Sequence, residues 1–185
     1  MTTENQTVIT TQSEDVYIEQ PSFKRWLKHA FYFKSSRRFF TAEQAEAITI
    51  AIEQAEDGHR GEIQVIVEAN LPSHIAYRYD SKARAQALFA KYRVWDTERN
   101  SGVLIYLNLC EHQIELVADR GINQAVDTTR WDQIVQLMTP YFKQNNFAEG
   151  LCIGITELGE ILEQFYANDP HDPEGNELPN TPRFL

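Results

Sequence analysis

The chain has 185 residues, of which 42% are hydrophobic, and this is enough apolar material for one domain with its own core. Its formal net charge of −10 argues against binding to nucleic acid, because an acidic surface repels phosphate. Two cysteines do not make a disulfide framework, and no apolar run reaches the roughly 18 residues that a membrane-spanning helix needs. Residues 1–20 also lack the basic and apolar regions of a signal peptide, so we expect a cytoplasmic protein.

The chain begins with two segments of opposite character. Residues 1–20 are polar and acidic, which predicts disorder. Residues 21–40 are basic and aromatic, and a short helix is predicted between Ser22 and Phe33. This helix either packs on the domain with its lysine stems over apolar surface or lies on the anionic inner face of a membrane. The cationic residues of the segment, which contains no acidic one, are Lys24, Arg25, Lys28, Lys34, Arg37 and Arg38.

The folded domain is predicted to span residues 41–166. A capping box formed by Thr41 and Gln44 begins its first helix, and Gly58 is a suitable residue to end it. A β-branched strand follows at residues 62–69, and a helix with small apolar residues follows at 82–92.

The second half of the domain contains a predicted hairpin and two further helices. Residues 103–109 are almost continuously apolar, as is typical of a strand covered on both faces, and residues 113–119 return as its antiparallel partner. A helix is predicted from Thr128 to Phe142, and Pro140 is expected to kink or end it. The last helix runs from Asn145 to Phe165. The residues that remain, 167–185, are predicted to form an irregular tail.

This order of elements predicts the fold class. A strand, a helix and a second strand form a right-handed parallel unit, and the third strand pairs with the second as a hairpin. Helices lie before, between and after the strands, so they can cover both faces of the sheet. We therefore predict a three-layer α/β/α sandwich with a small mixed sheet.

Four polar residues are predicted to meet at one edge of this sheet. The first strand begins there, the loop at residues 95–101 enters the second strand there, and the hairpin returns the third strand to the same edge. Carboxylate and amide oxygens suit Ca²⁺, and to a lesser extent Mg²⁺. The alternative is a set of ordinary salt bridges and loop caps, with nearby arginines neutralising the acids. The four candidate metal ligands are Glu62, Asp96, Asn100 and Asp119.

Two sequence blocks, Val94 to Tyr106 and Ala118 to Ile122, carry a resemblance to a known family. With the flanking helices they resemble the TPM domain, which is shared by thylakoid lumen proteins, photosystem II-associated proteins and modulators of levamisole receptors. The likeness covers residues 40–165 approximately and is closest to bacterial members, here of a cytosolic branch. It implies an α/β/α sandwich. It also implies a function related to those of members that act like acid phosphatases, bind calcium or assist membrane complexes.

Three functions are compatible with these observations. The first is a non-enzymatic interaction or regulatory domain with an unidentified protein partner, which binds Ca²⁺ or Mg²⁺ through the four candidate ligands. The second is a metal-assisted phosphomonoester hydrolase, in which Asp96 or Asp119 holds the ion or activates water. The third is a peripheral membrane adaptor that uses the basic segment. The sequence contains neither a nucleophile–base pair nor a glycine-rich phosphate loop, so it assigns no catalytic residue.

Overall fold

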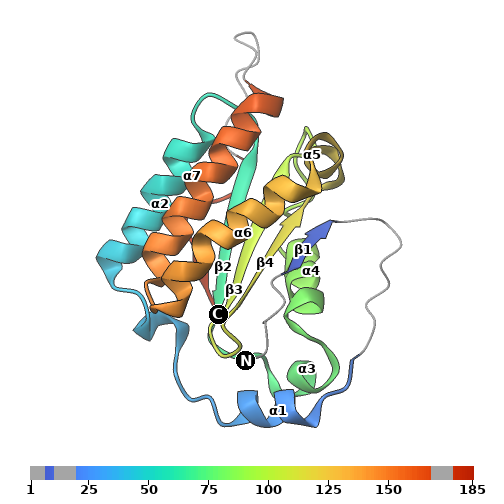
Figure 1. Ribbon diagram of the computed structural model, residues 1–185, viewed down its shortest axis with the longest axis vertical. Coiled ribbons are helices and arrows are strands. Elements are labelled where there is room, and N and C mark those ends of the chain that lie inside the picture. Colours follow the sequence, from blue (N-terminus) through green and yellow to red (C-terminus); the bar gives the residue numbers. More distant parts are fainter. Residues whose placement is uncertain (1–6, 11–19, 168–176) are drawn as a thin grey trace.

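The structure is a computed structural model, and it describes residues 7–10, 20–167 and 177–185. Five strands form one mixed sheet in the order β1-β4-β3-β2-β5 (Figure 1). Strand β3 is antiparallel to β4, and the other three neighbouring pairs are parallel. The strands are β1 (Thr7–Thr10), β2 (Glu62–Glu68), β3 (Gly102–Asn108), β4 (Gln113–Ala118) and β5 (Arg183–Phe184).

Helices cover both faces of the sheet. Figure 1 shows α2, α7 and α6 side by side across one face, and α4 lies on the other. The predicted α/β/α sandwich is confirmed, as is the parallel pairing of the first two predicted strands. The helices are α1 (Phe23–Ala30), η1 (Ser36–Arg38, a 3-10 turn), α2 (Ala42–Glu56), α3 (Ser73–Arg78), α4 (Ser81–Lys91), α5 (Arg120–Ala125), α6 (Thr128–Lys143) and α7 (Phe147–Tyr166).

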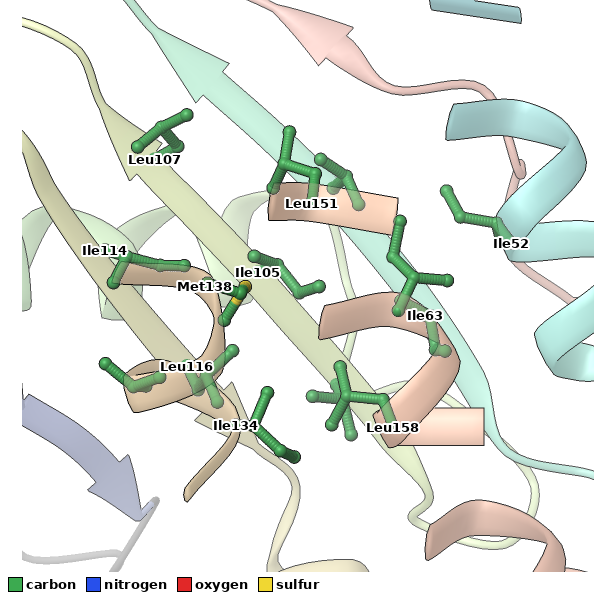
Figure 2. Close-up of a cluster of buried hydrophobic side chains, with 14 of the residues drawn as sticks. Ile52, Ile63, Ile105, Leu107, Ile114, Leu116, Ile134, Met138, Leu151 and Leu158 are labelled. Carbon is green, nitrogen blue, oxygen red and sulfur yellow. The ribbon is translucent and has the colours of Figure 1, made fainter. Parts of the chain in front are cut away.

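The larger core lies between the sheet and the three helices α2, α6 and α7. Ile63 and Ile105 of the sheet point toward Met138 and Leu151 of the helices (Figure 2), and all four side chains are buried. Burial of each such side chain contributes about 1.5–3 kcal/mol. Helices α6 and α7 approach closely because α7 has a glycine at Gly154, where a Cβ atom would lie 2.3 Å from the sulfur of Met138.

The smaller core lies on the opposite face, between the sheet and α4. Ile66 and Leu104 of the strands pack there against Leu88 and Phe89 of α4. Even-numbered positions of β2 and β3 therefore face α4, and odd-numbered positions face the larger core, as the period of two in a strand requires. Both strands are buried along their full length.

Both ends of the chain differ from their predicted irregular conformation. Within the segment predicted to be disordered, Thr7–Thr10 form β1, which pairs with β4, while residues 1–6 and 11–19 lie outside the described residues. In the predicted tail, Arg183 and Phe184 form β5 against β2. Each end therefore extends one edge of the three-stranded centre, where unpaired backbone groups need partners.

Three helical details also differ from the prediction. The short helices α3 and α5 are additional, because six residues show too little periodicity to be predicted. Pro140 does not end α6, which continues to Lys143. Pro140 and Gln136 are exposed, so water can bind the Gln136 carbonyl that the missing proline N–H leaves without a helical partner. Across the described part of the chain, no helix combines the length and the apolar content needed to cross a bilayer.

Candidate functional site

The sheet edge where the four predicted ligands were expected to meet contains Glu62 and Asp119 on either side of Gly102. Glu62 is in register with Gly102 across β2 and β3, and the amide of Asp119 donates a 2.9 Å hydrogen bond to the Gly102 carbonyl. Asn100 lies two residues before Gly102 in the chain. The hairpin therefore returns Asp119 to the edge at which β2 and β3 begin.

The carboxylate of Glu62 is occupied by the C-terminal tail. Its two oxygens accept hydrogen bonds of 3.0 Å from the amides of Glu177 and Leu178. Burial raises the pKa of this carboxyl, while the two amides partly oppose the rise. In this arrangement Glu62 anchors the tail beside β2.

The loop residues Asp96 and Asn100 behave differently from each other. Asp96 is exposed, and its carboxylate lies 3.9 Å from the guanidinium of Arg93. The backbone of Asn100 has a φ of 52°, and its carbonyl accepts a 3.2 Å hydrogen bond from Ile122. This close approach requires a glycine at position 121, where a Cβ atom would lie 2.5 Å from the Asn100 oxygen. The loop is thereby held against the start of α5.

Asp119 is the residue of this edge with unused binding capacity. It caps α5: its Oδ1 accepts a 2.6 Å hydrogen bond from the amide of Arg120. Its Oδ2 is buried and has no hydrogen-bond partner. Burial raises the pKa of Asp119, and Arg120 opposes the rise. An uncompensated buried carboxylate oxygen is costly and attracts a hydrogen-bond donor or a cation.

The structure therefore places Asn100 against the start of α5, the helix that Asp119 caps, while the carboxylate of Glu62 binds the tail and Asp96 is exposed. In the described ranges, no three or more His, Cys, Asp or Glu side chains form a group that could hold a metal ion. The four-residue ligand set stays a prediction. The alternative of ion pairs and caps also has support at this edge, since Arg60 and Glu98 form an ion pair of 2.7 Å.

A buried polar cluster that the sequence analysis missed lies at the opposite end of β2. Arg84 donates two hydrogen bonds of 2.9 and 2.7 Å to the carboxylate of Glu68, which also accepts 2.8 Å from the hydroxyl of Tyr106. Burial raises the pKa of Tyr106 well above its ordinary value, and the charge of Glu68 adds to this. All three groups satisfy one another, so the cluster fixes α4 to the sheet. The polar residues at even positions of β2 were its sequence signal.

Helix α1 docks on the domain through its polar side. The guanidinium of Arg25 donates a 2.8 Å hydrogen bond to the Ala76 carbonyl of α3. The ring of His29 is 1% exposed; its Nδ1 accepts 2.9 Å from the Leu71 amide, and its Nε2 lies 3.6 Å from the Glu111 carboxylate. Two residues of α1 that are four apart therefore hold the helix to the protein with hydrogen bonds.

The opposite side of α1 is apolar and faces solvent. Phe23, Leu27 and Phe31, also four residues apart, are 65%, 42% and 68% exposed, and Phe33 after the helix is 84% exposed. Exposed cations lie among them in the chain. We call this set the basic aromatic surface; it consists of Phe23, Lys24, Leu27, Lys28, Phe31, Phe33, Lys34, Arg37 and Arg38. The sequence predicted the helix but not that its apolar side points outward.

Comparison with protein families gives a match to the TPM domain over residues 34–161. The chain belongs to the TPM-domain family. The predicted family is thus confirmed. The match does not include α1 or β5, so the exposed stripe of α1 and the tail strand are additions to the matched TPM domain.

Solved structures support the same assignment. BA42 from the psychrophilic bacterium Bizionia argentinensis is 34% identical, with a TM-score of 0.70 over 78% of this chain and 94% of that one. The N-terminal domain of a P. gingivalis protein is 19% identical, with a TM-score of 0.58 over 72% and 83% of the two chains. The N-terminal domain of cg2496 from Corynebacterium glutamicum is 10% identical, with a TM-score of 0.53 over 75% and 82%. The last two share the fold alone. No curated protein matches.

Proposed function

We propose that this TPM-domain protein is a peripheral adaptor that binds the anionic, cytoplasmic face of a membrane through its basic aromatic surface. The observation that carries the proposal is the outward orientation of the apolar stripe on α1. Polar contacts from Arg25 and His29 fix this orientation, so the stripe cannot turn inward without losing hydrogen bonds to buried groups. A helix with an apolar face outward and lysines beside it is suited to the boundary between headgroups and acyl chains.

The charge distribution favours an anionic bilayer as the partner of this surface. Residues 21–40 contain no acidic residue, although the chain as a whole has a net charge of −10. Each Lys or Arg close to an anionic leaflet contributes about 1 kcal/mol to the free energy of membrane binding. Insertion of Phe31 and Phe33 adds a hydrophobic contribution. The acidic remainder of the molecule is repelled, which favours contact through this surface alone.

The aromatic residues provide the direct test of the proposal. We expect a Phe31→Ser, Phe33→Ser double variant to bind vesicles of phosphatidylglycerol and phosphatidylcholine at least roughly tenfold more weakly than the native protein, because the hydrophobic contribution of the two rings is lost. Sedimentation with the vesicles measures this affinity. Leu137→Ser is the matched control, since Leu137 is 44% exposed on α6, outside the surface. Equal binding of the double variant and the control would contradict the proposal.

A divalent-cation site at Glu62, Asp96, Asn100 and Asp119 is the second candidate. It is supported by the buried Oδ2 of Asp119, which has no hydrogen-bond partner, and by the contact of Asn100 with Gly121 in the helix that Asp119 caps. Occupation by Ca²⁺ or Mg²⁺ would require Asp96 and Glu62 to exchange their present partners. Both candidates treat the domain as a non-enzymatic interaction or regulatory module.

Isothermal titration with Ca²⁺ and Mg²⁺ tests the cation site. We expect the native protein to bind at least one of the ions and Asp119→Asn to bind it roughly tenfold or more weakly, because a carboxylate ligand is lost while the helix cap is kept. Asp127→Asn is the matched control, since Asp127 caps α6 in the same way and is exposed. If native protein and Asp119→Asn give the same heat, the cation site is excluded.

A further inference from the structure

A concave site lies between the start of α2 and the C-terminal tail. It has a volume of about 660 Å³, which is within the range of small-molecule sites. The residues that line one side are Arg37, Phe40, Thr41, Ala42 and Ala45, and those that line the other are Tyr92, Pro179 and residues 181–185. The tail is held in place by β5 and by the hydrogen bonds to Glu62, so both walls of the pocket are fixed to the domain.

Two guanidinium groups supply positive charge to this pocket. Arg183 is positioned by a 3.2 Å hydrogen bond from its Nε to Gln64 and by the ring of Tyr92, whose centroid lies 4.6 Å from the guanidinium carbon. Arg37 is exposed at the end of η1 and lines the opposite wall. Planar guanidinium groups match the oxygens of phosphate and carboxylate better than an ammonium does.

The start of α2 adds a weaker attraction for anions. This helix has 15 residues, and Thr41 and Ala42 at its N-terminal end line the pocket. The side chain of Thr41 accepts a hydrogen bond from the Gln44 amide in the capping box. The dipole of the helix adds positive potential at the same end. The remaining lining is largely apolar: Phe40, Ala45, Pro179, Pro182 and Phe184 contribute, and the rings of Phe40 and Phe184 lie 5.0 Å apart.

We infer that this pocket binds a phosphate group that carries an apolar substituent. No Asp or Glu side chain is among the lining residues, although the chain is acidic overall. The guanidinium of Arg183 already contacts Gln64 and the ring of Tyr92, so we place the phosphate toward Arg37 and the start of α2. The phosphate can come from the headgroup of a lipid or from a soluble phosphate ester. The inference does not depend on membrane binding, because a soluble ester would occupy the same pocket.

Soluble probes test this inference without a bilayer. Binding is followed by two-dimensional NMR with dihexanoyl phosphatidylglycerol below its micelle concentration, with phenyl phosphate and with inorganic phosphate. We expect saturable shifts at Thr41, Thr181 and Phe184 with one or both of the substituted probes and weaker binding of inorganic phosphate. A response to the lipid alone assigns the headgroup, and a response to phenyl phosphate assigns a soluble ester. If none of the probes gives saturable shifts, the inference is wrong.

Adjacent arginines provide a matched pair of variants. Arg37→Gln should weaken binding of the best probe roughly tenfold, or about 1.4 kcal/mol, whereas Arg38→Gln should not, since Arg38 does not line the pocket. Ala45→Leu should also reduce binding, because it fills the pocket without changing charge or helix propensity appreciably. Equal losses for Arg37→Gln and Arg38→Gln would contradict the inference. If the native protein binds a soluble probe but does not bind vesicles, only the membrane proposal is contradicted.

Discussion

At the scale of single residues, burial raises the pKa of two acids well above the ordinary value. Glu115 on β4 is 3% exposed, and its Oε2 has no hydrogen-bond partner. Burial raises the pKa of Glu115 to about 9, and the charge of Asp80 adds to the rise while Lys82 opposes it. Burial also raises the pKa of Glu56, to about 8, although its carboxylate accepts a 2.7 Å hydrogen bond from the Ile63 amide. The folded protein therefore keeps protons that the unfolded chain releases at neutral pH.

This proton uptake predicts a pH-dependent effect of Glu115→Gln. Between the ordinary pKa of 4.5 and a folded value of about 9, the unfolded state binds fewer protons, so the free energy of unfolding falls as pH rises. The glutamine mimics the protonated acid and should stabilise the protein by about 3 kcal/mol at pH near 7, with little effect at pH near 4. Denaturant unfolding at both pH values measures this. The exposed Glu46→Gln is the control, and a pH-independent effect of Glu115→Gln would contradict the account.

At the scale of elements, close contacts explain why particular glycines occur in the sequence blocks that define the family resemblance. A Cβ atom at Gly102 would lie 1.8 Å from the carbonyl oxygen of Val94, because the turn after α4 crosses directly over the start of β3. This crossing sets where the loop to β3 can run. It thereby fixes the edge at which Asn100 contacts the helix that Asp119 caps.

Gly102→Ala should therefore destabilise the fold by about 3 kcal/mol or more, since the opposing atom is backbone and cannot rotate away. Gly58→Ala is a suitable comparison. At Gly58 nothing lies within 4 Å of the added Cβ atom, and only the φ of 89° disfavours alanine, at a cost of about 1 kcal/mol. Chemical denaturation measures both variants, and a smaller loss for Gly102→Ala than for Gly58→Ala would contradict this explanation.

The elements also show how far the sequence predicts the structure. The hairpin, its parallel partner strand and the long helices follow from apolar runs and caps that are local in the chain. The hydrogen bond from the tail to the Glu62 carboxylate could not be predicted, because 115 residues separate Glu62 from Glu177 and no local sequence pattern indicates the contact. For the same reason β1 and β5, which depend on distant partners, were missed. The side of α1 that faces the domain depends on the hydrogen bond that Arg25 donates to α3 and on the one that His29 accepts from the Leu71 amide, and apolar periodicity reveals neither.

At the scale of the whole molecule, charge and apolar surface are segregated. The TPM domain buries two apolar cores, one on each face of the sheet, and exposes single apolar residues such as Leu137, while α1 presents a stripe of apolar residues to solvent. Helices α1 and α3 lie together at one end of the molecule, away from α5 and the Asp119 edge (Figure 1). A bilayer that binds α1 would leave the opposite edge accessible to a partner or a cation, which is the geometry that an adaptor requires.

Sedimentation of the native protein with vesicles tests the central claim most directly. Vesicles with and without phosphatidylglycerol are compared at low salt and at roughly molar salt, where charges are screened within about 3 Å. We predict binding to the anionic vesicles at low salt, substantial release at high salt and little binding to phosphatidylcholine alone. Equal sedimentation with both kinds of vesicle, or sedimentation with neither, would contradict the assignment of the basic aromatic surface to an anionic membrane.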